Sequence, residues 1–196
     1  PMLSYGMELG YIEKFSYSYI KCQETYKNIY TTEELKILLT KPTAKNTTNR
    51  FAEYRNWTIC CFLLGTGLRA LELRELKIKN VDLSSDFVNL AHTKNKRPRQ
   101  VPIPKTLHNI LVGYLQYRSG ELEDYLFPNS FGDRIPRSTL QMGITKYCKK
   151  RGIEKYSLHL FRHTFATLFL RNGGQFATLK TILGHSSYKM MDTYIH

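Results

Sequence analysis

The sequence predicts a mainly α-helical domain with one small antiparallel β-sheet, an α+β class in which helices dominate. Helical spacing of apolar residues recurs in several long segments that end at glycines. Alternating strand-like spacing occurs in one region only, between residues 87 and 104. A chain of 196 residues, 42% of them hydrophobic, is long enough to bury one sizeable core.

The helical part is expected to begin near residue 30. Residues 1–29 are interpreted as the tail of one helix and then a linker. They are rich in tyrosine, and their apolar residues do not recur at a regular spacing that would face a core. The run from Thr31 to Glu34 fits a capping box, in which a hydroxyl and a carboxylate satisfy free backbone N–H groups. A polar loop over residues 41–49 follows that first helix.

A long helix is predicted over residues 50–64, and Gly65 and Gly67 are expected to stop it. Its apolar residues fall on one stripe, which consists of Phe51, Tyr54, Trp57, Cys61 and Leu64. A short helix over residues 70–76 comes next.

The elements after residue 86 are predicted from turn residues and from the spacing of apolar residues. Strands are predicted over residues 87–92 and 99–104, joined by a basic turn at 93–98. Helices are predicted over residues 104–118, over 138–151 with Gly152 closing it, and over 157–171. Two short helices with Gly184 between them complete the chain.

The charge balance points to a polyanionic partner. The formal net charge is +13 and the pI is about 9.6, which favours nucleic acid, with a membrane surface or a merely solvated basic face as alternatives. No run reaches the ~18–20 apolar residues of a membrane span. Four cysteines without C-x-x-C or zinc-finger spacing predict reduced thiols in a cytosolic setting.

Two segments present arginines at predicted helix starts. The glycine-rich turn before Arg69 delivers that side chain to a helix whose Glu72, three residues on, could hold the guanidinium in place. His159 and Arg162 are also three residues apart at a helix N-terminus, where free N–H groups favour anions. For each segment taken alone, an ordinary surface ion pair or a satisfied histidine remains an alternative.

His159 and His163 also have the i, i+4 spacing of helical zinc ligands, so a zinc hydrolase is a rival class. The zinc motif needs a glutamate directly after the first histidine, and Leu160 stands there. Arg162 between the histidines would repel a dication. The sequence therefore predicts no metal site.

The turn and the C-terminus supply further candidates. Lysines and arginines gather in the turn without any acidic residue, and such clusters usually contact phosphates; they are Lys94, Lys96, Arg97, Arg99 and Lys105. Neighbouring arginines and partial desolvation would lower the pKa of one lysine, so that it could donate a proton. Tyr194 follows His185 by nine residues, but with fourteen tyrosines in the chain neither residue stands out by itself.

Taken together and in order, five segments resemble the motifs of the tyrosine recombinase (integrase) family of phages, transposons and Xer-like resolvases. They are Thr66-Gly67-Leu68-Arg69-Ala70-Leu71-Glu72-Leu73, Thr93-Lys94 before Asn95-Lys96-Arg97-Pro98-Arg99-Gln100-Val101-Pro102, His159-Leu160-Phe161-Arg162-His163-Thr164-Phe165-Ala166-Thr167, Leu183-Gly184-His185-Ser186-Ser187 and Thr193-Tyr194-Ile195-His196. The resemblance implies a catalytic domain over residues 30–196, preceded by the end of a core-binding domain and a linker over 1–29. The family's C-terminal tail is expected to be missing.

The resemblance implies site-specific cleavage and rejoining of DNA through a 3′-phosphotyrosyl intermediate, without metal, ATP or another cofactor. The implied catalytic residues are Tyr194, Arg69, Lys94, His159, Arg162 and His185. Tyr194 would be the nucleophile, Lys94 the acid, His159 the base, and Arg69 and Arg162 the phosphate ligands, with a hydrogen bond from His185. Lys96 is an alternative acid, although the family pattern favours Lys94.

Outside the catalytic set, Lys96, Arg97 and Arg99 are expected to bind DNA, and Glu72 and His163 to support the site. The expected partner is double-stranded DNA, bound by a homotetramer on paired sites in the full-length protein, whereas this piece could be monomeric. The expected location is the cytoplasm, at the bacterial nucleoid. Two rivals use similar residues: a type IB topoisomerase-like strand transferase and a catalytically silent DNA-binding module.

Overall fold

The computed structural model describes residues 29–42, 50–90 and 98–184, and every structural statement below refers to them. In chain order the elements are α2 (Thr32–Leu39), α3 (Arg50–Thr66), α4 (Ala70–Glu75), a 3₁₀ turn η1 (Ile78–Asn80), β1 (Val81–Asp82), β2 (Phe87–Leu90), β3 (Arg99–Pro102), α5 (Lys105–Arg118), α6 (Arg137–Lys149), α7 (Leu158–Arg171) and α8 (Phe176–Leu183). The predicted mainly helical class with a small antiparallel sheet is confirmed.

The sheet has the order β1-β2-β3, and both pairs are antiparallel. β2 and β3 pair Val88 with Val101, and both side chains are buried. The sequence pattern missed β1, because a strand of two residues is too short to show an alternation. β3 also ends earlier than predicted, since Pro104 serves as the N-cap of α5.

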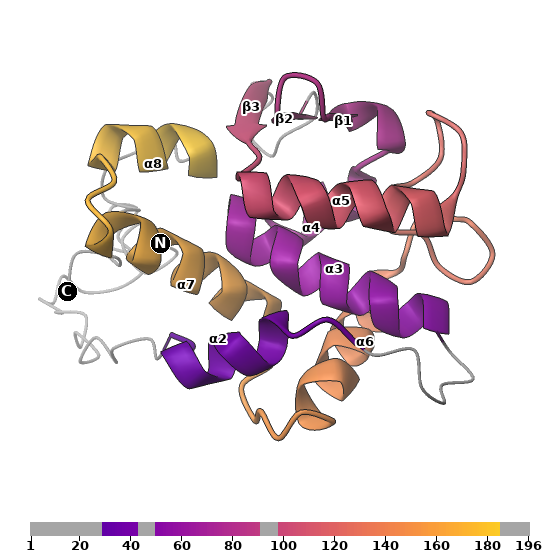
Figure 1. The fold of residues 1–196 in the computed structure, drawn as a ribbon, viewed down its shortest axis with the longest axis horizontal. Coiled ribbons are helices and arrows are strands. Elements are labelled where there is room, and N and C mark those ends of the chain that lie inside the picture. Colours follow the sequence, from indigo (N-terminus) through magenta and orange to yellow (C-terminus); the bar gives the residue numbers. More distant parts are fainter. Residues whose placement is uncertain (1–28, 43–49, 91–97, 185–196) are drawn as a thin grey trace, which may run out of the picture.

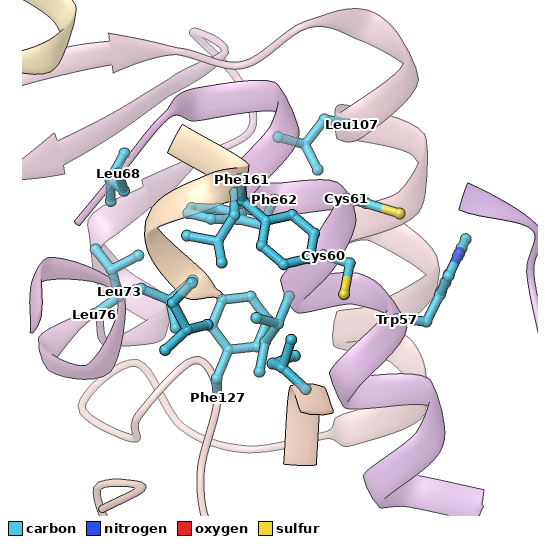
Figure 2. Packing of buried hydrophobic residues seen from close by; sticks show 14 of the residues in the cluster. Trp57, Cys60, Cys61, Phe62, Leu68, Leu73, Leu76, Leu107, Phe127 and Phe161 are labelled. Carbon is cyan, nitrogen blue, oxygen red and sulfur yellow. The ribbon is translucent and has the colours of Figure 1, made fainter. Parts of the chain in front are cut away.

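Helix α3 is the centre of the molecule, where it contacts α2, α5, α6 and α7 (Figure 1). The residues of the predicted stripe pack into or against the core, but burial is not confined to them, because every residue from 55 to 63 is buried. A helix covered on all sides must bury residues all round, including small polar ones such as Thr58. Figure 2 shows Phe62 and Cys60 of α3 facing a core that includes Phe161 and Phe127.

The predicted caps are largely confirmed. The hydroxyl of Thr31 accepts from the amide of Glu34, and the Glu34 carboxylate accepts from the amide of Thr31, which completes the expected capping box. Gly65 does not stop α3, which runs on to Thr66. Gly67, with φ of +64°, is the residue that breaks the helix.

The described cysteines are buried and carry no disulfide. Burial raises the pKa of the Cys61 thiol to about 12, and that of Cys148 to about 11. Neither is therefore a thiolate at neutral pH, in agreement with the prediction of structural reduced thiols at Cys60 and Cys61.

Helices α7 and α8 lie together on one side of the molecule, at the left of Figure 1. The main core and a smaller one meet there: Ala166, Leu179 and Leu183 form a separate buried cluster between the two helices. α8 also contacts β3, so it touches both the helical part and the sheet. Of the described helices, none is both long and apolar enough to cross a membrane.

Candidate active site

A tight turn delivers Arg69 to the start of α4. Gly67 adopts a left-handed conformation after α3, and the amide of Arg69 then donates to the Glu72 carboxylate at 2.9 Å as the N-cap of α4. Position 67 also has no room for a side chain, because a Cβ there would lie 2.3 Å from a ring carbon of Phe165. The turn therefore requires glycine for both its backbone angle and its packing.

Replacing Gly67 with alanine is expected to lower the free energy of unfolding by ~2–4 kcal/mol, because backbone strain adds to overpacking. Gly152→Ala is the matched control: Gly152 also has positive φ, at +71°, but nothing lies within 4 Å of its would-be Cβ. It should lose only the strain contribution, about 1–2 kcal/mol. Urea denaturation measures both. Equal losses would contradict the packing argument.

The Glu72 carboxylate joins two arginines. Its Oε1 accepts from Arg69 Nη1 at 3.1 Å and from Arg99 Nη1 at 2.9 Å, while its Oε2 accepts from Arg99 Nη2 at 3.0 Å as well as from the Arg69 amide. Its side chain is only 3% exposed. The ion pair expected from the Arg69–Glu72 spacing is present, and a bidentate pair with Arg99 accompanies it.

Burial by itself would raise the pKa of Glu72, but the hydrogen bond from Arg99, that from the Arg69 backbone and the charges of both arginines outweigh burial and hold the pKa below its usual range. A depressed carboxyl pKa contributes stability that is fully present above the ordinary glutamate pKa of about 4.3 and is lost as the pH falls through the lower folded value. We expect Glu72→Gln to be less stable than the wild type at neutral pH and to lose less stability on acidification. Chemical denaturation from neutral pH to pH 3 tests this; parallel curves would contradict it.

Arg162 lies one turn into α7 and is 2% exposed. Ser157 caps this helix, and its hydroxyl accepts from the amide of His159 at 3.3 Å. Arg162 Nη1 donates to the carbonyl of Gly67 at 2.7 Å, and its Nη2 donates to the carbonyl of Leu183 at 2.8 Å. These contacts fix the guanidinium between the turn that carries Arg69 and the end of α8.

The C-terminal end of α8 brings the three arginines together. Three successive carbonyls there each accept from one guanidinium: that of Ile182 from Arg99 at 2.9 Å, that of Leu183 from Arg162 and that of Gly184 from Arg69 at 3.3 Å. The last carbonyls of a helix have no donor within the helix, and together with the helix dipole they make this end negative, so cations are favoured there. Gly184 ends the helix with φ of +62°.

The two histidines of α7 lie beside this cluster. His159 is exposed, whereas His163 is buried, and their rings meet edge to face with centroids 4.9 Å apart. His159 precedes Arg162 by three positions on the same helix. Within the described residues, no group of three histidine, cysteine or acidic side chains could hold a metal ion.

The structure thus brings Arg69, Glu72, Arg99 and Arg162 into one cluster, with His159 and His163 on the adjoining turn of α7. Arg99 was expected among the DNA-binding residues, but its side chain is 8% exposed and its guanidinium bonds Glu72 and Ile182. The other candidates lie outside the described residues; they are Lys94, Lys96, Arg97, His185 and Tyr194.

Sequence reasoning did not anticipate the backbone acceptors of α8. Gly184 was identified as a break between helices and as part of the Leu183–Ser187 motif, but nothing in a sequence pattern shows that neighbouring carbonyls receive arginines from α4, β3 and α7. The one sequence feature that reflects this arrangement is the glycine itself. Position 184 has no room for a side chain, because a Cβ there would lie 2.8 Å from Arg99 Nη1.

Comparison with known proteins assigns the class. The model of the phage integrase family matches residues 29–196, and the chain therefore belongs to that family. It is 33% identical over 151 residues to the tyrosine recombinase XerC of Bacillus pumilus, an alignment that covers 72% of this chain and 49% of the relative. The chain thus spans about half the length of the relative it matches.

Solved structures agree. A XerA recombinase crystal structure shares 32% identity with a TM-score of 0.75, covering 91% of this chain and 62% of that one. The XerH recombinase bound to its difH DNA shares 26% identity with a TM-score of 0.68, covering 86% of this chain and 50% of that one. The fold is that of a tyrosine recombinase catalytic domain.

Proposed function

We propose that this chain is the catalytic part of a site-specific DNA recombinase that cleaves and rejoins strands through a covalent phosphotyrosine. The observation that carries the proposal is the convergence of Arg69 and Arg162 on the end of α8, directly before His185. Guanidinium groups suit phosphate because their paired N–H donors match its oxygens. Membership of the integrase family supports the same conclusion.

In the proposed reaction, the phenolic oxygen of Tyr194 attacks a DNA phosphorus and forms a 3′-phosphotyrosyl bond while the bond to the 5′-oxygen breaks. His159 takes the phenolic proton, and Lys94 gives a proton to the leaving 5′-oxygen. Attack by a 5′-hydroxyl of another strand reverses these steps and releases the tyrosine. The phosphoester bond is exchanged rather than hydrolysed, so the sequence of steps needs no ATP.

Arg69 and Arg162 stabilise the charge that grows on the two non-bridging oxygens in the transition state. Their positions are set in advance, since Arg69 is held by Glu72 and Gly184 and Arg162 by Gly67 and Leu183. We propose that His185, next in the chain after Gly184, hydrogen-bonds the same phosphate and that His163 supports the base.

We propose that Lys96 and Arg97 contact the DNA backbone, that residues 30–196 form the catalytic unit, and that the full-length protein recombines paired sites as a homotetramer in the cytoplasm. XerH, one of the structural relatives, is bound to its difH DNA substrate. The type IB topoisomerase alternative has no specific observation in its favour. A plasmid-relaxation assay beside a two-site recombination assay separates the two activities.

The test is the covalent adduct itself. The full chain is mixed with a pool of random-sequence duplexes that each carry a few nicks. When the enzyme cleaves close to a nick, the short fragment with the 5′-hydroxyl diffuses away. The strand cannot then be rejoined, and the enzyme stays covalently linked to DNA. Denaturing gels then separate protein linked to DNA, and sequencing of the bound strands gives the cleavage site. A denaturation-resistant adduct linked to a 3′ end is expected, and its absence from the whole pool would refute the proposal.

DNA binding should depend steeply on salt, because lysines and arginines that meet phosphates release condensed counterions. With about 6–10 phosphate contacts, affinity for a random duplex should fall ~10³–10⁵-fold between 50 and 200 mM salt. Fluorescence anisotropy measures it, and Lys96→Gln should lower the slope by about 0.9. A flat titration would contradict the proposed backbone contacts.

A further inference from the structure

We propose that Arg99 is a positioning residue for the strand-transfer reaction rather than a DNA contact, an inference that rests on the proposed function. Arg99 begins β3 and lies five residues after Lys94 in the chain. It acts through the groups it holds: Glu72, and through it Arg69, on one side, and the end of α8 on the other.

The guanidinium of Arg99 points into the protein, toward Glu72 and the end of α8. Its two terminal nitrogens donate to the two oxygens of Glu72 at 2.9 and 3.0 Å, and its Nε donates to the carbonyl of Ile182 at 2.9 Å. All three nitrogens of the guanidinium therefore have an intramolecular acceptor, and the side chain is 8% exposed. Arg99 differs from the proposed phosphate ligands by this bidentate pair with a carboxylate, since the contacts described for Arg162 are to two backbone carbonyls.

The packing around Gly184 shows how closely Arg99 approaches α8. A Cβ at Gly184 would lie 2.8 Å from Arg99 Nη1 and 3.0 Å from its Cζ. The arginine therefore lies directly against the residue that ends α8 and precedes His185. Since Gly184 also accepts from Arg69, Arg99 and Arg69 hold the same helix end.

Through these contacts Arg99 connects three segments that carry proposed catalytic groups. β3 follows Lys94 by five residues in the chain, Glu72 holds Arg69, and α8 is followed directly by His185. Arg69 itself is the more accessible of the pair, with 23% of its side chain exposed. The two arginines therefore have different roles, since Arg69 faces the phosphate whereas Arg99 fixes where Arg69 and α8 lie.

The experiment compares Arg99→Met with the wild type and with Arg134→Met, which removes an arginine from an exposed ion pair with Glu75. Two quantities are measured on the cleavage sequence recovered from the nicked pool: the rate of adduct formation at saturating DNA, and the dissociation constant with its salt slope. Amide hydrogen exchange in α8 against α3 and the melting temperature are measured on the protein alone. Arg99→Lys is added because an ammonium keeps the charge but cannot reach Ile182 and both Glu72 oxygens at once.

For Arg99→Met we expect adduct formation to slow about 10–100-fold. This is the range found in metal sites when a residue that orients a metal ligand is lost. The dissociation constant and salt slope should stay within about twofold of wild type, and exchange should rise in α8 but not in α3. Arg99→Lys should recover part of the rate. Arg134→Met should match the wild type throughout.

Two results would overturn the inference. An unchanged rate with weaker binding and a salt slope smaller by about 0.9 would make Arg99 a phosphate contact. A lower melting temperature with unchanged rate and unchanged exchange in α8 would make it an ordinary structural ion pair. If the wild type forms no adduct, the proposed function is refuted. Amide hydrogen exchange in α8 of Arg99→Met still shows, independently of that result, whether Arg99 holds α8 in place.

Discussion

Tyr194→Phe is expected to abolish the covalent protein–DNA adduct while leaving DNA affinity unchanged. Phenylalanine keeps the aromatic ring but removes the only oxygen that could bond to phosphorus, so no part of the covalent path remains. Affinity should persist because it comes from lysines and arginines that meet phosphates, and the substitution removes none of them. A suicide substrate on a denaturing gel, with anisotropy for binding, measures both.

The control for this variant is Tyr117→Phe, which changes an exposed tyrosine of α5. It should form the adduct as the wild type does. An adduct that persists in Tyr194→Phe at the wild-type rate would show that another residue is the nucleophile, and mapping of the attached peptide would then identify it among the remaining tyrosines.

Arg162→Lys is expected to slow adduct formation ~10²–10³-fold at saturating DNA, the usual cost of losing a preorganised donor to the transition state. Lysine keeps the positive charge, but a single ammonium cannot bond the carbonyls of Gly67 and Leu183 and also present paired donors to phosphate. The effect should therefore fall on the rate rather than on the dissociation constant.

Arg171→Lys is the matched control, since Arg171 is exposed at the end of the same helix. Because Arg162 is buried, thermal melting must show that the variant folds. If it does not, Arg69→Lys tests the same claim at a partly exposed guanidinium. A wild-type rate in a folded variant would contradict the role of these arginines.

Local features of the fold could be predicted because their causes lie within a few residues. The capping box at Thr31 and the Arg69–Glu72 pair both depend on partners three positions apart. Two other predictions were incomplete for a physical reason. α3 is covered on all sides, which its own spacing cannot reveal, and β1 is only two residues long.

The site could be predicted only in part for the same reason. Its arginines were found because their neighbours in sequence carry signals, such as Gly67 before Arg69. The partners of Arg99 are 27 residues away at Glu72 and 83 residues away at Ile182, so only the folded chain shows that this arginine points inward. A basic turn in the sequence does not distinguish arginines that face DNA from those that face the core.

The central claim is that Arg69 and Arg162 neutralise one and the same phosphate. Replacing the phosphate at the recovered cleavage site with a neutral methylphosphonate removes the charge that these arginines would stabilise. The rate penalty of Arg162→Ala, measured as adduct formation, should then shrink from ~10²–10³-fold toward unity, whereas the penalty of Tyr194→Phe should remain complete. An Arg162→Ala penalty as large on the neutral linkage as on the charged one would contradict the account.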